Sequence, residues 1–281
     1  AVRNSLDHAV SAFRKIDASG WEKIDEFPFD SKLRRTSIIV ANKEKQEAVL
    51  IVKGAPEEIF NDSAFYKNKE TVFSPEIKKQ ASEEYNALSR DGFRVLGGAI
   101  KQVAHSERFD IKGNEHEMIF VGFLAFFDPP KHSAKVTLQT MRAYHVAIKI
   151  ITGDNHLVTQ KIAQELNLPV TGIVSGEELR ALRGEALKRK GGEANIFVRV
   201  MPEDKELIIR TLRESGNVVG YVGDGVNDVL SLRAADVGIS VNNAVDIAKE
   251  TADIILLRKG LHEIIEGIIE GRKTFANTFK Y

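Results

Sequence analysis

The chain has 281 residues, of which 43% are hydrophobic and 28% are charged, a composition typical of a globular protein with one large or two ordinary domains. Lysine plus arginine and aspartate plus glutamate number 40 each, so the net charge is zero and no nucleic-acid partner is expected. The absence of cysteine excludes a disulfide framework and thiolate chemistry.

The N-terminal part of the sequence predicts an antiparallel α+β domain. The chain begins with Ala1 rather than methionine and shows no signal peptide, so we expect it to be part of a longer polypeptide. β-Branched runs separated by a polar loop predict a hairpin, and Pro56 suits the first turn of a helix. The predicted strands are Thr36–Ala41, Ala48–Val52, Arg94–Val103 and Met118–Phe127, and a second helix is predicted over Pro75–Ser89. The longest apolar run, Ile119–Phe127, is far shorter than the roughly 20 residues of a membrane-spanning helix, so we expect a soluble chain.

Asp128–Pro130 predicts a stiff connector, because two prolines fix φ twice and remove two hydrogen-bond donors. After it, short apolar runs alternate with helical patterns, which predicts a parallel sheet covered on both faces. The predicted strands are Val146–Ile151, Ile196–Val200, Val218–Val222, Val237–Val241 and Ile254–Leu257, with helices that include Asn155–Leu166 and Glu203–Glu214. Ligands of such sheets bind at the carboxyl ends of the strands.

Gly223–Asp228 (GDGVND) follows the predicted strand Val218–Val222 directly. Its two glycines permit tight turns, and the carboxylates of Asp224 and Asp228 are oxygen ligands of the kind that Mg²⁺ takes in proteins. Asp-Gly and Asn-Asp are also ordinary turn residues, which is the alternative interpretation. Their position after a buried strand favours a magnesium site.

A second polar loop, Thr152-Gly153-Asp154-Asn155, follows the predicted strand Val146–Ile151. A hydroxyl group and the amides of a helix N-terminus can hold a phosphoryl group, although the loop could instead be a simple helix cap. Lys205 near the start of a later helix could neutralise phosphate charge, or it could be a surface residue. No candidate for the attacking nucleophile accompanies these groups.

The motifs together resemble those of P-type ATPases, which have a haloacid-dehalogenase-like fold. The matching segments occur in the order and spacing of that family, and they are Phe27–Ser37, Lys53–Glu57, Asp128–Lys131, Thr152–Asp154 and Gly223–Asp228. The resemblance implies an α/β chain with two domains. Residues 1–124 would form an α+β, antiparallel-sheet nucleotide-binding domain, and residues 125–281 the C-terminal part of a Rossmann-like, parallel-sheet phosphorylation domain that lacks its first strand.

In the first domain, the resemblance implies a set of nucleotide-binding residues. Asp7 would lie near the adenine, Phe29 would stack on it, and Lys53 with Gly54 would form part of its pocket. Arg34 would lie at the nucleotide, and Arg94 would reach the phosphates. Without the motifs, Phe29 would equally suit a core position and both arginines the surface.

In the second domain, the resemblance places Thr152, Gly153 and Asp154 opposite the transferred phosphoryl group. Lys205 would neutralise charge, and Asp224 with Asp228 would bind magnesium, with Asn227 alongside. Asp128 would be a hinge aspartate near the phosphorylation site. The substrate would be ATP and the cofactor Mg²⁺.

Two departures from the family pattern are visible. The Asp-Lys-Thr-Gly-Thr-Leu-Thr segment that carries the phosphorylated aspartate does not occur in this sequence, so this chain alone is expected to bind ATP weakly and to hydrolyse nothing. Val229-Leu230-Ser231-Leu232 stands where the family usually has Ala-Pro-Ala-Leu, which puts the start of the following helix in doubt.

The resemblance is greatest to bacterial magnesium-transporting ATPases, and it implies a multi-pass membrane parent whose transmembrane and actuator domains are partners of this chain at the cytoplasmic face of the cell membrane. The segments that carry this comparison are Leu6–Ala9, Ala234–Val241, Ala252–Leu257 and Arg272–Tyr281. The alternatives are a pump for another cation (Ca²⁺ or H⁺), a soluble phosphatase of the same fold, or an ATP-sensing module without enzymatic activity.

Overall fold

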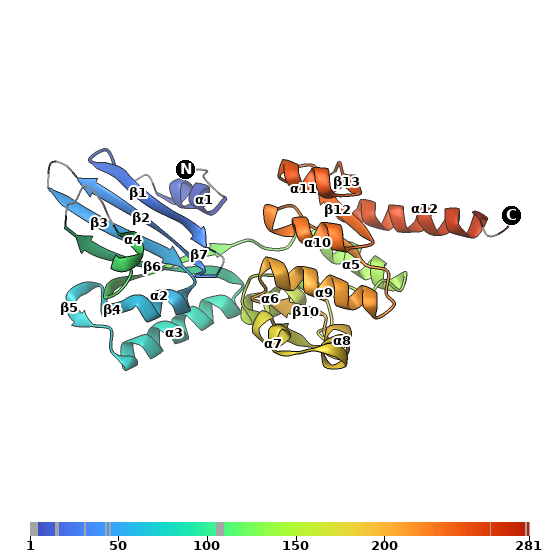
Figure 1. The fold of residues 1–281 in the computed structure, drawn as a ribbon, viewed down its shortest axis with the longest axis horizontal. Coiled ribbons are helices and arrows are strands. Elements are labelled where there is room, and N and C mark those ends of the chain that lie inside the picture. Colours follow the sequence, from blue (N-terminus) through green and yellow to red (C-terminus); the bar gives the residue numbers. More distant parts are fainter. Residues whose placement is uncertain are drawn as a thin grey trace. The chain divides into compact units, whose positions relative to one another are not determined.

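The computed structural model describes residues 5–14, 17–30, 32–42, 44, 46–104, 110–258, 260–278 and 280. The chain divides into two compact units, Ala1–Asp128 and Pro129–Tyr281 (Figure 1). The division falls inside the predicted connector Asp128–Pro130. The predicted assignment of residues 1–124 and 125–281 to domains of the family remains a prediction.

The first unit is built on a seven-stranded sheet with the order β1-β2-β3-β6-β7-β4-β5. All neighbouring strands are antiparallel except β4 and β7. The strands are β1 (Trp21–Asp30), β2 (Arg35–Asn42), β3 (Glu47–Gly54), β4 (Ser63–Tyr66), β5 (Asn68–Val72), β6 (Phe93–Val103) and β7 (Met118–Phe127). The predicted β2–β3 hairpin and the predicted strands β6 and β7 are confirmed, whereas β1, β4 and β5 were not predicted.

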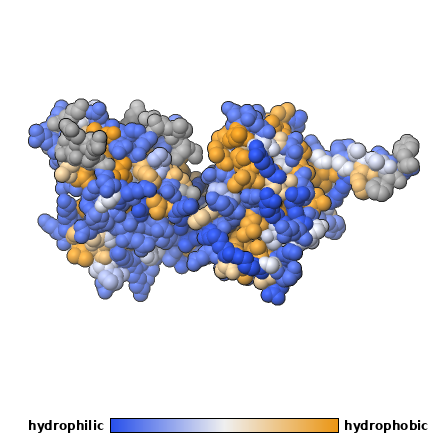
Figure 2. Space-filling view, in the orientation of Figure 1, coloured by the Kyte–Doolittle hydropathy of each residue, from blue (hydrophilic) through white to orange (hydrophobic). Residues whose placement is uncertain are grey.

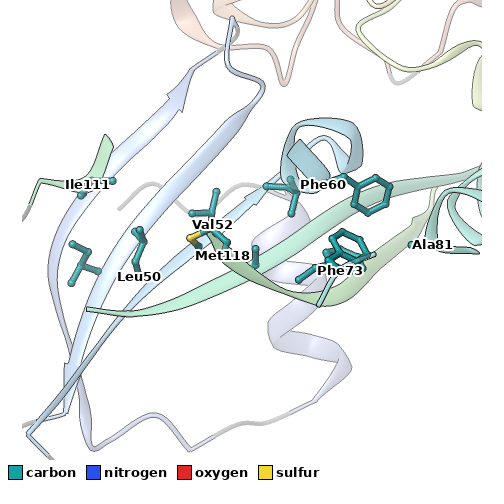
Figure 3. Close-up of a cluster of buried hydrophobic side chains, with 11 residues drawn as sticks. Leu50, Val52, Phe60, Phe73, Ala81, Ile111 and Met118 are labelled. Carbon is teal, nitrogen blue, oxygen red and sulfur yellow. The ribbon is translucent and has the colours of Figure 1, made fainter. Parts of the chain in front are cut away.

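Two helices cover one face of this sheet, namely α2 (Pro56–Asp62) and α3 (Pro75–Arg90) (Figure 1). Both begin with proline at the first helical position, as predicted, and the Ser74 hydroxyl caps α3 by accepting from the amide of Ile77. Buried and less buried residues alternate strictly in β3, so Leu50 and Val52 face these helices, and the core that they share contains Phe60, Phe73 and Met118 (Figure 3). Helices α1 (Ser5–Phe13) and α4 (Ile111–Asn114) complete the unit.

The second unit alternates short strands with helices. Its strands are β8 (Ile150–Ile151), β9 (Ile173–Ser175), β10 (Ile196–Val198), β11 (Gly220–Val222), β12 (Val237–Val241) and β13 (Ile254–Leu256). Its helices are α5 (His132–Ala143), α6 (His156–Glu165), α7 (Gly176–Ala181), α8 (Gly184–Glu193), α9 (Pro202–Glu214), the 3₁₀ turn η1 (Val226–Asp228), α10 (Val229–Ala234), α11 (Asp246–Thr251) and α12 (His262–Thr278). The predicted alternation of strands and helices is confirmed.

The parallel strands form two separate sheets rather than the single sheet that the sequence predicted. One has the order β8-β10-β9 and the other the order β11-β12-β13, and every pairing in both is parallel. β8 is also shorter than the predicted strand Val146–Ile151, because the amide of Val146 still bonds to the end of α5, at the carbonyl of Met141. An apolar run predicts a buried strand but not which strand lies beside it, which is why the number of sheets was not predictable.

Apolar side chains remain at the surface of the second unit (Figure 2). Leu230 on α10 and Ile247 on α11 are among the large apolar residues that are exposed there. Within the described ranges, none of the helices combines the length and the apolar character needed to cross a membrane.

Candidate functional site

Phe29 is exposed because of an irregularity in strand β1. The pairing of β1 with β2 shifts between Phe27 and Asp30, so two residues of β1 face one residue of β2. Phe27 keeps to the core side, packing against the core and under the ammonium of Lys112, whereas Phe29 leaves the alternation and its side chain is 65% exposed. A large aromatic ring presented to solvent in this way is free to stack on a flat ligand.

Gly54 is required by a close backbone approach at the start of β2. Arg34 has a left-handed backbone with φ of 51°, and its carbonyl accepts a hydrogen bond of 3.0 Å from the amide of Ala55. A Cβ atom on Gly54 would lie 2.5 Å from that carbonyl oxygen and 2.6 Å from the Cβ of Arg35. Only glycine therefore allows the turn that carries Arg34 to lie against the end of β3.

Lys53 lies on the sheet face opposite α2 and α3. In β3 the buried positions are Ala48, Leu50, Val52 and Gly54, so Lys53 points the other way, where its ammonium contacts the carboxylate of Asp7 at 2.5 Å. The same alternation in β6 places Arg94 on that face, at an exposed position. The structure thus brings Asp7 and Lys53 together, and it places Arg94 on the same side of the sheet.

Arg35 anchors this end of the sheet from the core side. Its guanidinium forms ion pairs with Asp62, at the end of α2, and with Glu115, where one N···O distance is 2.7 Å. The hydroxyl of Ser37 also donates to Glu115, which is buried. Sequence reasoning did not find this cluster, because nothing in Arg34-Arg35 shows which of the two arginines pairs with Asp62 and Glu115.

Asp228 is the centre of the candidate site in the second unit. One of its carboxylate oxygens accepts from the ammonium of Lys205 at 2.8 Å and from the hydroxyl of Tyr221 at 2.6 Å. The other accepts from the amides of Asp224 and Gly225 at 3.2 and 3.1 Å. The residue is only 7% exposed. Burial by itself would raise the pKa of Asp228, but the bonds from Lys205 and Tyr221 outweigh it and hold the pKa below its ordinary value.

Asp224 and Asn227 are presented to solvent on the same loop. The loop backbone is fixed on both sides, since the carbonyl of Asp224 accepts from the amide of Val245 at 3.0 Å and the carbonyl of Gly223 accepts from the Ser240 hydroxyl at 2.9 Å. The helix whose start was in doubt does form, as η1 followed by α10. Val229-Leu230-Ser231-Leu232 therefore leaves the carboxylate loop in place.

The Thr152 loop is joined to the segment that leads into α9. The amide of Val200 donates to the carbonyl of Thr152, and the amide of Arg199 donates to the carbonyl of Asp154. The Thr152 hydroxyl accepts from the amide of Asp154, so the loop forms a turn of its own. The helix cap is the next residue, Asn155, whose side chain accepts from the amide of Val158 at 3.0 Å. Gly153, between them, is exposed.

The structure therefore brings Lys205 and Asp228 into contact, and it connects the Thr152 loop to Lys205 through the chain between β10 and α9. Asp128 follows β7 directly and is exposed. Among the residues that the structure describes, there is no group of three or more His, Cys, Asp or Glu side chains placed to hold a metal. Any cation here would need ligands besides Asp224 and Asp228.

Tyr221 is the residue of this site that sequence reasoning missed. It lies in β11, where an aromatic residue in an apolar run predicts only a core position. One feature of the sequence could have identified Tyr221 as part of the site. It stands three residues before Asp224, at the carboxyl end of the strand that the Asp224 and Asp228 loop follows.

Comparison with known proteins gives one matching family model and several relatives. Residues 9–133 match the family model for the P-type ATPase cytoplasmic domain N. The whole chain is 42% identical to magnesium-transporting ATPase, P-type 1, of Escherichia coli strain K12, and 38% identical to the protein of the same name from Salmonella typhimurium strain 14028s. The calcium-transporting ATPase of Bacillus subtilis strain 168 is 30% identical over 94% of the chain.

The chain spans about a third of the length of these relatives, 32% for the two magnesium-transporting ATPases and 30% for the calcium-transporting ATPase. The similarity nevertheless extends over all of the present sequence in the first two cases. The chain belongs to the P-type ATPase family.

Proposed function

We propose that this chain is the ATP-binding part and most of the phosphoryl-transfer part of a P-type ATPase that transports a cation, with Mg²⁺ as the favoured ion. The observation that carries the proposal is the loop around Asp228, in which a lysine and two backbone amides organise one carboxylate while a second, Asp224, stays exposed. The arrangement suits a cation that faces a phosphate group.

The two carboxylates of the loop, Asp224 and Asp228, would have different roles in binding Mg²⁺. The two oxygens of a carboxylate offer about four hydrogen-bonding positions, and Asp228 already accepts four hydrogen bonds. Asp224 is therefore the direct ligand, and Asp228 acts from behind it by holding the loop. Bound Mg²⁺ would neutralise charge that develops on the phosphate. Waters and phosphate oxygens would complete the coordination of Mg²⁺, which usually takes only one or two protein carboxylates.

A strand from elsewhere in the longer protein would complete the second unit as a single Rossmann-like, haloacid-dehalogenase-type sheet. β8 and β11 are each at the edge of their own sheet, and the side chain of Ile151 in β8 packs both with the cluster around Phe197 and with the cluster around Tyr221. Both strands are less buried than β10, which is buried throughout. A strand inserted between them would carry the attacking aspartate to the carboxyl ends where Thr152 and Asp224 lie.

The first unit would hold ATP on the sheet face that carries Lys53. Phe29 would stack on the adenine, Lys53 and Asp7 would line its pocket, and Arg34 and Arg94 would meet the polar part of the nucleotide. Asp128 and the prolines after it would act as the hinge about which the two units close during transfer. The partners would be the transmembrane and actuator parts of the same polypeptide, which would place this chain at the cytoplasmic face of the membrane.

Magnesium is favoured over calcium as the transported ion because the magnesium-transporting relatives are more similar to this chain, at 42% and 38% identity compared with 30%. A soluble phosphatase of the same fold would not need a nucleotide-binding surface such as the one proposed here on the Lys53 face of the sheet.

The proposal is tested by titrating the chain with MgATP in a calorimeter, for the wild type, Phe29→Ala and Phe275→Ala. Both phenylalanines are 65% exposed, so the second substitution is a matched control in the other unit. Loss of the stacking ring should weaken binding by about tenfold, since base–aromatic stacking contributes roughly 1–3 kcal/mol. Equal affinities of all three proteins for MgATP would contradict the proposal that Phe29 stacks on the adenine.

A further inference from the structure

The hydroxyl of Tyr221 is enclosed beneath the Asp228 loop. The residue is 9% exposed, and its ring packs with Ile209, Leu232 and Ala248 in one apolar cluster of the second unit. Its hydroxyl donates to Asp228 at 2.6 Å, the length expected of a strong hydrogen bond from a hydroxyl to a carboxylate. A phenylalanine would fill the same space, so the packing of the ring does not explain the hydroxyl.

The ring and the carboxylate are pressed against the same glycine. A Cβ atom on Gly223 would lie 2.5 Å from the Cβ of Asp228 and 3.0 Å from the Cε1 of Tyr221. Tyr221, Gly223 and Asp228 are therefore tightly packed together, directly beside the loop residue Asp224.

Lys205 and Tyr221 restrain Asp228 in different ways. Both donate to the same carboxylate oxygen, but the lysine ammonium ends a flexible four-carbon chain, whereas the phenol is held by a rigid ring in a packed core. With one oxygen fixed from below, the other is directed at the amides of Asp224 and Gly225. The orientation of the Asp228 carboxylate thus fixes the positions of these two loop amides.

We propose that Tyr221 is a positioning residue of the magnesium site: through Asp228 it fixes the loop amides so that Asp224 faces the cation, without touching the cation itself. This inference rests on the proposed magnesium site. The tyrosine hydroxyl then has a role that an apolar side chain in the same strand could not have. The two carboxylates also have different roles: Asp224 binds the metal, and Asp228 holds the loop.

The test uses Tyr221→Phe in the full chain, with Tyr85→Phe as the matched control. The hydroxyl of Tyr85 also donates to a carboxylate, Glu57, from a buried ring, but in the first unit. Amide NMR spectra recorded during a Mg²⁺ titration report both the loop and the metal affinity. In Tyr221→Phe the amide proton signals of Asp224 and Gly225 should move upfield before any Mg²⁺ is added. The Kd for Mg²⁺ should then rise by about tenfold, as is common when a group that supports a metal ligand is lost.

Asp228→Asn supplies a further test, because a residue that acts through Asp228 has nothing to act on in that background. Tyr221→Phe should then change the Kd for Mg²⁺ by less than about twofold, which corresponds to roughly 0.4 kcal/mol. The inference is overturned if Tyr221→Phe leaves both amide signals and the Kd unchanged. It is also overturned if the effect on Kd persists in full in Asp228→Asn, or if Tyr221→Phe merely unfolds the second unit while Tyr85→Phe is tolerated.

Failure of the underlying magnesium site has a different signature. If Asp224→Asn binds Mg²⁺ as tightly as the wild type, the proposed metal site is wrong. The amide signals recorded without Mg²⁺ still decide whether Tyr221 positions the loop.

Discussion

Single residues near the proposed nucleotide site are constrained by contacts that their neighbours in sequence do not share. Phe27 and Phe29 differ by two positions, yet one packs on the core and the other is exposed, because the register shifts between them. Arg34 and Arg35 are adjacent, yet one sits in a left-handed turn and the other in a buried ion-pair cluster. Motif resemblance identified Phe29 and Arg34 as candidates. The register shift in β1 and the ion pairs of Arg35, however, depend on partners in other parts of the chain that no local sequence pattern specifies.

Gly54→Ala should destabilise the first unit, because the new methyl group would clash with the backbone of Arg34 and Arg35. Overpacking of this kind costs about 1–3 kcal/mol. Gly98→Ala is the control, since a Cβ there meets nothing closer than 3.6 Å. Urea unfolding followed by the fluorescence of Trp21, the one tryptophan in the sequence, reports this unit. Equal midpoints for the two variants would show that the close approach at Gly54 is not rigid.

The free energy of unfolding should depend on pH through Asp228. Its pKa in the folded protein is lowered from an ordinary value of 3.8, so its ionised form stabilises the fold. That stabilisation is complete above pH 3.8 and is lost as the pH falls through the lower folded value. The difference in Tm between the wild type and Asp228→Asn should therefore be largest near neutral pH and shrink below pH 3.8. A difference that stays constant into that range would contradict the network around Asp228.

Secondary-structure elements were predicted well where the chain is strongly patterned. Helices α3, α6 and α9 have polar and apolar residues at helical spacing with caps or proline at their starts, and strands β2, β3, β12 and β13 are short apolar runs bounded by polar turns. Strand β1 was missed because its sequence, WEKIDEFPFD, is mostly charged and contains proline, and its position at the sheet edge explains why that is tolerated. The edge position is a tertiary property and leaves no local signal.

The Arg35 cluster ties β2 to α2 and to the segment after α4, so its loss should loosen several elements at once. Arg35→Met leaves Asp62 and the buried Glu115 without their cation, which should cost about 3–5 kcal/mol. Arg34→Met, one residue away, should change stability by less than about 0.5 kcal/mol, as is usual for substitutions away from packed or paired groups. Urea unfolding monitored at Trp21 compares the two, and a larger loss for Arg34→Met would contradict the assignment of roles.

At the scale of the whole molecule, resemblance predicted two regions and an incomplete parallel sheet, and physical pattern alone predicted one continuous sheet. The structure has two sheets in the second unit, with β8 and β11 as edges. The amide of Ile150 bonds to Asn195, just before β10, and the amide of Thr152 bonds to Phe197 in β10, so the amide of Ile151 between them points away from β10. The amide of Gly223 bonds to Ile239 in β12, so by the same alternation the amide of Val222 points away from β12. The local sequence of a strand does not show whether its neighbour comes from another part of the protein, so the division into two sheets could not be predicted.

Hydrogen exchange should reveal these edges. In the isolated chain, the amides of Ile151 and Val222 should exchange much faster than that of Phe197 in β10, which is fully buried between two strands. Mass spectrometry with residue-resolved fragmentation, or NMR, gives the rates. Protection of Ile151 and Val222 equal to that of Phe197 would mean that the two edges are already satisfied and that no further strand is needed.

The most direct experiment measures ATP binding and ATP turnover on the same purified chain, with and without the substitution Asp224→Ala. The groups that hold nucleotide and magnesium should be present in this chain, and the attacking aspartate should be supplied by another segment. We therefore expect saturable MgATP binding with no release of phosphate above the Asp224→Ala background. Steady hydrolysis that is lost on Asp224→Ala would contradict it, because the 281 residues would then contain a complete catalytic site.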